Sequence, residues 1–146
     1  MPGTAENAAA ALDMLRNNVD DFILSDGGST RITYLIDGVV YKVQWADADI
    51  DNLTEFDKIN RMREHLPEGI FYPEVSLFNV NDIPVIAMDF IEGALKAECF
   101  CMKDERCTDW CMDNDMLVKL QPWLTDTSGL NVIVNAIGMF IIDAAF

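Results

Sequence analysis

The sequence predicts an α+β fold in which a mostly antiparallel sheet carries one principal helix. Short runs rich in β-branched and aromatic residues, separated by turn residues, lie at 23–45 and again at 71–90. Between them, residues 49–66 have apolar side chains three or four positions apart, which is the spacing of an amphipathic helix. The chain has 146 residues, of which 51% are apolar, and this suffices for one domain with a genuine core.

The charge of the chain narrows the classes of partner. Twenty-five acidic against ten basic residues give a formal net charge of −15, and such a surface repels the phosphate backbone of nucleic acids. Direct nucleic-acid binding is therefore not expected, whereas a basic protein partner is favoured. No apolar run reaches the length of a membrane span, and no secretory signal is recognisable. We expect a cytoplasmic protein without membrane contact.

The first 22 residues are expected to form a helical extension. Residues 1–8 are small and polar, which is typical of a frayed terminus. From Ala8 to Phe22 the pattern is helical, with apolar residues three or four positions apart. These apolar positions are Leu12, Leu15, Val19 and Phe22.

Two turn signals divide the next stretch into strands. Gly27 and Gly28 separate two β-rich runs, and Asp37-Gly38 is a strong hairpin turn before the strand 39–45. Lys42 lies in the middle of this otherwise apolar strand. A lysine on an edge strand can reach solvent along its own stem. Alternatively, its ammonium can be held over a phosphate, and this stretch alone leaves both interpretations open.

Residues 49–66 are expected to form the principal helix, which Pro67 ends. Glu55 could point inward toward Lys42, or it could be a solvated first-turn residue that complements the helix dipole. His65 is the single histidine, and we expect it at the surface near the helix end. Candidate caps are Asp51, Asn52 and Thr54. The predicted apolar face consists of Leu53, Phe56, Ile59 and Met62.

Two further strands are predicted at 71–78 and 83–90, joined by a loop over 79–82. The run from Val85 begins apolar, turns polar and ends on Gly93, as at the exit of a strand from a sheet. The order through residue 92 is therefore hairpin, strand, helix, strand, strand.

Four cysteines fall within a short stretch of the C-terminal part. Their spacing is C-x-C, five residues, then C-x3-C, whereas zinc sites usually use C-x2-C pairs. They could bind zinc, or they could be buried thiols that pack like small apolar residues. These residues are Cys99, Cys101, Cys107 and Cys111.

The end of the chain predicts a β-hairpin with polar residues at its open end. Two apolar runs, 132–134 and 139–142, flank a turn at 135–138. Asp126 and Asn131 precede the first run, and Asp143 follows the second. Because an antiparallel hairpin brings its ends together, these oxygens could hold a magnesium ion. The alternative is that they are ordinary turn residues flanking buried strands.

Taken together, these segments resemble the eukaryotic-like protein kinase fold in the small, divergent form found in bacteria and phages. The resemblance runs from about residue 24 to 143, with an N-lobe-like part at 23–93 and a truncated C-lobe-like part at 94–146. Gly27 and Gly28 are similar to the glycine-rich loop over the phosphates. Lys42 and Glu55 match the ATP-contacting lysine and the helix glutamate that pairs with it.

The remaining matches concern the hinge, the catalytic loop and the metal site. Met88 and Asp89 lie where the gatekeeper and hinge contact the nucleotide. Asp126 and Asn131 have the spacing of the catalytic-loop residues, and Asp143 falls at the position of the metal-binding aspartate. The resemblance thus implies ATP and Mg²⁺ as cofactors and phosphoryl transfer to a Ser/Thr hydroxyl. It requires Lys42 and Asp143 to face a shared cleft.

Several departures from the kinase pattern favour a weaker or absent activity. The glycine loop is one glycine short, Ser128 replaces the usual basic residue, and Ala144-Ala145 follow the metal aspartate. With the sequence ending at Phe146, we expect a protein without the segments that normally bind a peptide substrate. One alternative is an inactive, phage-type pseudokinase that regulates a host protein through its acidic surface. Another is an acidic mimic of nucleic acid, and self-association could cover the terminal hairpin.

Overall fold

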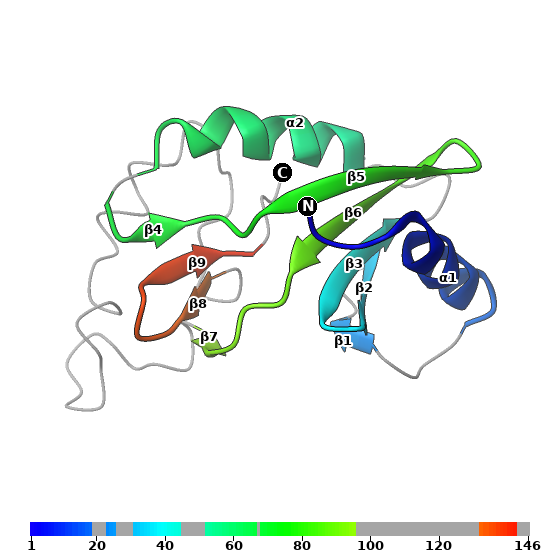
Figure 1. Cartoon of the computed structure of the whole chain (residues 1–146), viewed down its shortest axis with the longest axis horizontal. Helices are drawn as coiled ribbons and strands as arrows, with labels where there is room; N and C mark the ends of the chain where they lie inside the picture. Colours follow the sequence, from blue (N-terminus) through cyan, green and yellow to red (C-terminus); the bar gives the residue numbers. More distant parts are fainter. Residues whose placement is uncertain (19–22, 26–30, 45–51, 67, 96–131, 143–146) are drawn as a thin grey trace. The chain divides into compact units, whose positions relative to one another are not determined.

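The computed structural model describes residues 1–18, 23–25, 31–44, 52–66, 68–95 and 132–142 (Figure 1). It confirms the α+β class, with two helices and two sheets in the described part of the chain. The chain divides into two compact units. The first comprises Met1–Asp57 and Glu74–Phe90, and the second comprises Lys58–Pro73 and Ile91–Phe146. Neither described helix is long and apolar enough to cross a membrane.

The first unit contains a five-stranded antiparallel sheet with the order β1-β2-β3-β6-β5. Its strands are β1 (Ile23–Ser25), β2 (Arg31–Ile36), β3 (Val39–Gln44), β5 (Val75–Val80) and β6 (Ile83–Asp89). Strand β3, which carries Lys42, is the central strand and pairs with β2 and β6. The edge-strand interpretation of Lys42 is therefore wrong, because β3 has a paired strand on each side and Lys42 is buried.

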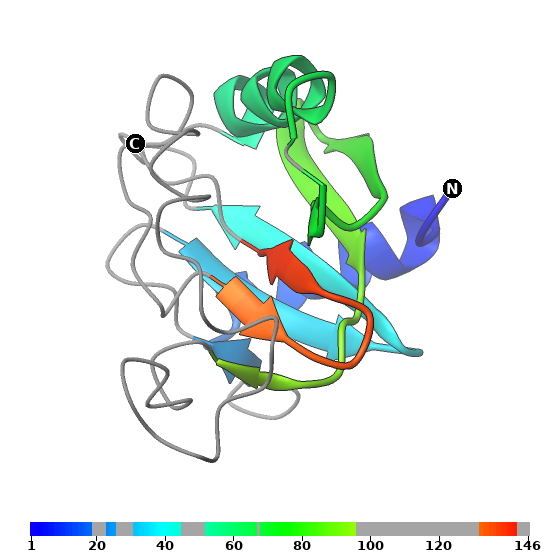
Figure 2. The same ribbon diagram turned by 90° about the vertical axis from the view of Figure 1, so that its left-hand side faces the viewer.

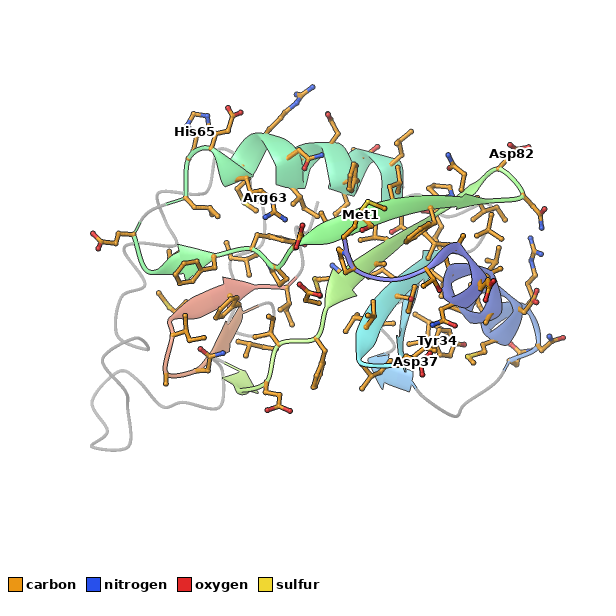
Figure 3. All side chains as sticks on the ribbon, in the orientation of Figure 1. Met1, Tyr34, Asp37, Arg63, His65 and Asp82 are labelled. Carbon is orange, nitrogen blue, oxygen red and sulfur yellow. The ribbon has the colours of Figure 1, made fainter. Side chains whose placement is uncertain are left out.

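Both tight hairpins of this sheet have two-residue turns in the left-handed region. Asp37 and Gly38 have φ values of 52° and 75°, which confirms the predicted turn between β2 and β3. Asn81 and Asp82 have φ values of 51° and 67°, and Figure 3 shows Asp82 at the tip of the β5–β6 hairpin. The predicted four-residue loop at 79–82 is thus too long, because asparagine and aspartate tolerate this conformation and let the strands continue to the turn.

The predicted strand 71–78 is two separate elements. Strand β5 begins only at Val75, and Ile70–Phe71 form β4 in the other sheet. Pro73 lies between them, and proline cannot donate the hydrogen bond that a continuous strand would need.

Helix α1 (Ala5–Arg16) begins earlier and ends earlier than the predicted helix from Ala8 to Phe22. Thr4 is its N-cap, and the Thr4 hydroxyl accepts a hydrogen bond from the Asn7 N–H at 3.1 Å. This cap explains why the first eight residues are not frayed as predicted. Residues 19–22, including Val19 and Phe22, lie outside the described residues.

Helix α1 contributes to the core of the first unit. One face of the helix packs against the sheet, and Figure 3 shows Tyr34 among the side chains beside it. The buried cluster consists of Ala8, Ala11, Leu12, Leu15, Tyr34, Tyr41, Val43, Val85 and Ala87. The chain before the helix is also fixed, because the Thr4 N–H donates to the Tyr41 hydroxyl at 3.2 Å. The predicted N-terminal helix thus packs on the sheet of this unit and contributes to its core.

Helix α2 (Asn52–Arg63) ends before the predicted residue 66, and its buried face differs from the predicted one in the first turn; residues 49–51 lie outside the described residues. Leu53, expected inside, is 53% exposed, whereas Asn52 and Glu55 are fully buried. Ile59 and Met62 are buried as predicted. The buried positions are spaced three or four apart, as on one helix face. The prediction failed at Leu53 because polar side chains occupy this face in the first turn.

The second unit contains a four-stranded sheet with the order β4-β9-β8-β7. Its strands are β4 (Ile70–Phe71), β7 (Ala94–Leu95), β8 (Val132–Val134) and β9 (Met139–Ile141). The predicted terminal hairpin is confirmed, with β8 and β9 antiparallel and side by side in Figure 2. Asn135 closes its turn, because the Asn135 side-chain oxygen accepts from the Ile137 N–H at 2.9 Å.

Candidate functional site

The centre of the candidate site is a buried ion pair between strand β3 and the first turn of helix α2. The Lys42 ammonium lies 3.0 Å from a carboxylate oxygen of Glu55, at hydrogen-bonding distance. The Lys42 side chain is 6% exposed and the Glu55 side chain is 0% exposed. The contact between these two residues is the one that the sequence suggested, and the solvated interpretation of Glu55 is wrong.

This pair is exceptional among the charged residues of the described part of the chain. Every other acidic side chain described there is exposed, and no other basic side chain described there is buried. Burying a charge has a large desolvation cost unless a partner and hydrogen bonds compensate for it. The sequence thus keeps one lysine and one carboxylate inside at a position where two apolar residues could pack.

The first turn of α2 is held on the sheet by a second group of buried polar contacts. The Asn52 side-chain amide donates to the Lys42 carbonyl at 2.9 Å and to the Pro84 carbonyl at 3.0 Å. The Asn52 backbone N–H donates to the side-chain oxygen of Gln44 at 2.6 Å. Asn52 is fully buried and Gln44 is 6% exposed. The first turn of α2 is thus anchored to both β3 and β6.

The predicted hinge residues lie at the end of strand β6. Met88 is buried and pairs directly with Val40 of β3. Because Lys42 is two residues from Val40, and residues paired across a sheet share a face, Met88 and Lys42 lie on the same face. Asp89 is exposed, and its backbone N–H donates to the Glu74 carbonyl at 3.3 Å. The structure therefore brings Met88, but not the Asp89 side chain, to the face of the ion pair.

The other predicted site residues lie outside the described residues. They are Gly27, Gly28, Cys99, Cys101, Cys107, Cys111, Asp126, Asn131 and Asp143. The described hairpin has Val132 paired with Ile141, so its two open ends lie opposite each other. Asn131 precedes this pair in the sequence and Asp143 follows it. Within the described ranges, no group of three or more metal-ligating side chains occurs. The magnesium and zinc sites stay predictions.

Sequence reasoning missed the roles of Asn52 and Gln44. Asn52 was predicted only as a candidate helix cap, and no role was predicted for Gln44. A signal was present, because Asn52 and Glu55 are three residues apart and therefore share a helix face. Likewise, Lys42 and Gln44 are two residues apart and share a face of the strand. Two polar pairs at matching spacing indicate a polar contact between helix and sheet.

The comparisons with known proteins give no family for this chain. A scan against models of protein families and a search of curated proteins both found no match.

Proposed function

We propose that this protein binds a nucleoside triphosphate with Mg²⁺ and is a kinase-like protein with limited phosphoryl transfer to a Ser/Thr hydroxyl. The observation that carries the proposal is the buried Lys42–Glu55 pair at 3.0 Å, with the lysine on the central strand and the glutamate in the first turn of the following helix. The resemblance noted in the sequence assigns this arrangement to the lysine that contacts ATP phosphates.

Energetics also support a role for this pair beyond stability. Replacing a buried ion pair by apolar residues of similar volume is often neutral or stabilising. A sequence under pressure for stability alone would gain little from Lys42 and Glu55. A lysine ammonium is a compact point charge that suits phosphate oxygens, and a fixed carboxylate can hold it ready for them.

The proposed roles follow from the chemistry of each side chain. Lys42 would bind the phosphates, and Glu55 would hold the ammonium in place. Met88 would contact the base from the buried face of β6. Magnesium, when bound, would neutralise charge on the phosphates, and hard oxygen ligands from Asn131 and Asp143 are of the type it prefers. Asp126 would orient the attacking hydroxyl.

Auxiliary positions complete the proposed nucleotide site. Gly27 and Gly28 would let the backbone approach the phosphates closely, because glycine has no Cβ. Asp89 would contribute its backbone carbonyl at the hinge, because its side chain is exposed and its N–H already donates to the Glu74 carbonyl. Phosphoryl transfer depends mainly on positioning and charge neutralisation, so these few groups could support slow chemistry.

Thermal unfolding with and without Mg-ATP tests nucleotide binding. A ligand at about 100 times its Kd stabilises a protein by about 2.7 kcal/mol, and each kcal/mol raises Tm by about 2–4 °C at this chain length. We expect this rise in the native protein and its loss in Lys42→Met and Asp143→Asn. Lys58→Met, which removes a half-buried lysine of α2, is the matched control and should keep the rise. A native protein whose Tm does not respond would contradict the proposal.

Transfer is tested separately from binding. Incubation with ATP labelled at the γ-phosphate should label the protein itself or an added substrate slowly. Asp126→Asn should keep the Mg-ATP thermal shift and lose the label, because it changes the group that orients the hydroxyl and leaves the phosphate-binding lysine intact. Binding without any label in the native protein would favour a pseudokinase.

A second function, regulation of a basic host protein, is favoured by the charge distribution. The net charge is −15, and in the described ranges all acidic side chains except that of Glu55 are exposed. Such a surface accelerates association with a positively charged partner. Capture of a basic partner that weakens steeply with salt would support this function. Competition of that partner with duplex DNA would instead support a nucleic-acid mimic.

A further inference from the structure

The first turn of helix α2 contacts both the side-chain ammonium and the backbone carbonyl of Lys42. Glu55 contacts the Lys42 ammonium at 3.0 Å, while the Asn52 amide donates to the Lys42 carbonyl at 2.9 Å. Asn52 and Glu55 are three residues apart, so both project from the same face of the helix. The helix therefore fixes the backbone and the charged group of one strand residue together.

The Asn52 side chain links two neighbouring strands to the helix. Its amide nitrogen has two N–H groups, and they bond the carbonyls of Lys42 in β3 and Pro84 in β6. Since Asn52 is fully buried, loss of these donors would leave the buried Lys42 carbonyl and the partly buried Pro84 carbonyl without these partners. A side chain so placed opposes any movement of the first turn away from the sheet.

Gln44, on strand β3, accepts a hydrogen bond from a backbone N–H at the start of the helix. The first backbone N–H groups of an α-helix have no partner within the helix. The Gln44 oxygen accepts one of them, from Asn52, at 2.6 Å. Side-chain oxygens commonly satisfy such N–H groups at helix starts, and this one belongs to a residue of β3. The start of the helix therefore gains this hydrogen bond when it lies against the strand.

We propose that Asn52 and Gln44 are positioning residues that keep α2 docked on β3 and β6, so that the Lys42–Glu55 pair is formed before any ligand or partner binds. An isolated helix of 12 residues is marginal in water, so its position depends on such contacts. The importance of the pair for nucleotide binding rests on the proposed function. The docking itself rests on contacts within the first unit and can be measured without nucleotide.

The test compares variants that remove one polar contact on either face of the sheet. Asn52→Leu removes both donors at similar volume, and Gln44→Met removes the acceptor at similar length. Tyr41→Phe is the matched control, because it removes the hydroxyl that accepts from Thr4 on the opposite face of β3. NMR of the ligand-free full chain measures how fast the Lys42 ammonium protons exchange with water, which shows whether the Lys42–Glu55 ion pair is formed. The Lys42→Met variant assigns the signal. Mg-ATP affinity is measured in parallel.

We expect at least tenfold faster exchange of the Lys42 ammonium protons in Asn52→Leu and Gln44→Met, and native exchange in Tyr41→Phe. Mg-ATP affinity should fall at least tenfold in the first two variants and stay native in the third. Native exchange in a folded Asn52→Leu would overturn the inference. If that variant does not fold, Gln44→Met decides by the same criterion. If the native protein does not bind Mg-ATP, the proposed function fails, and the exchange rates still decide whether the helix is held as inferred.

Discussion

The two faces of the five-stranded sheet use the same strands for different purposes. On the face covered by α1, Tyr41 and Val43 of β3 join an apolar cluster with the helix. On the opposite face, Lys42 and Gln44 of the same strand contact polar groups of α2. Both faces are buried, so solvent exposure does not explain the difference.

This contrast suggests that one face of the sheet mainly stabilises the fold and that the other also serves ligand binding. Burial of apolar surface stabilises a protein by roughly 25 cal/mol per Å² and does not depend on the direction of individual contacts. The α1 face can therefore stabilise the fold. The α2 face has buried charges and amides, each of which must be satisfied to avoid a penalty. We therefore expect substitutions on the α1 face to change stability alone, and substitutions on the α2 face to change ligand binding as well.

The largest effect is expected from Glu55→Leu. This change leaves the Lys42 ammonium buried without its carboxylate and should reduce the free energy of unfolding by about 3–5 kcal/mol. The double variant Lys42→Met/Glu55→Leu should recover most of that loss, because it removes both charges. Urea unfolding of the two variants measures both values. A single variant as stable as the native protein would show that the pair is not energetically coupled.

On the other face, Leu12→Ala should reduce the free energy of unfolding by about 3 kcal/mol. Leu12 is fully buried in the α1 cluster, and its truncation removes apolar contact and leaves a cavity. At a temperature where the variant is folded, its Mg-ATP affinity should equal that of the native protein. Urea unfolding measures the loss of stability, and a titration measures the Mg-ATP affinity. A folded variant that no longer binds Mg-ATP would contradict the proposal that the two faces have different roles.

A smaller effect is expected at the cap of α1. Thr4→Ala removes the hydroxyl that accepts from the Asn7 N–H and should cost about 1 kcal/mol. Thr4→Ser keeps the oxygen and is the matched control, which should remain within a few tenths of a kcal/mol. Thermal unfolding of the Thr4→Ala and Thr4→Ser variants measures the difference in stability. Equal stability of the alanine and serine variants would show that α1 does not depend on this cap.

The smallest effect is expected at Leu53, next to the buried Asn52. Because Leu53 is 53% exposed, Leu53→Gln should change the free energy of unfolding by less than about 0.5 kcal/mol. This result would support the observed helix face over the one predicted from apolar periodicity. A loss of several kcal/mol would instead indicate that Leu53 is buried, as the apolar periodicity predicted.

Much of the fold follows from local signals in the sequence. The Asp37-Gly38 turn, the terminal hairpin and the existence of α2 were predicted, because each depends on residues close together in the chain. The strand order was not predicted, since it depends on contacts between distant segments. The break at Pro73 and the early start of α1 after its cap Thr4 could have been predicted from local chemistry but were missed.

The candidate site was predicted in part. The proximity of Lys42 and Glu55 followed from a resemblance to a known family, because each residue alone has an ordinary surface interpretation. Asn52 and Gln44 were missed because apolar periodicity assigns polar residues to the solvent face. Here that rule fails in the first turn of α2, where hydrogen bonds to β3 and β6 satisfy the buried amides.

The most direct test of the central claim is an isothermal titration of Mg-ATP into the native protein and into Lys42→Met/Glu55→Leu. The double variant is suitable because it should stay folded without the buried charges. If the polar face is kept for nucleotide binding, the native protein should bind one equivalent, and the double variant should bind none. No binding by the native protein, or equal binding by both, would contradict this account.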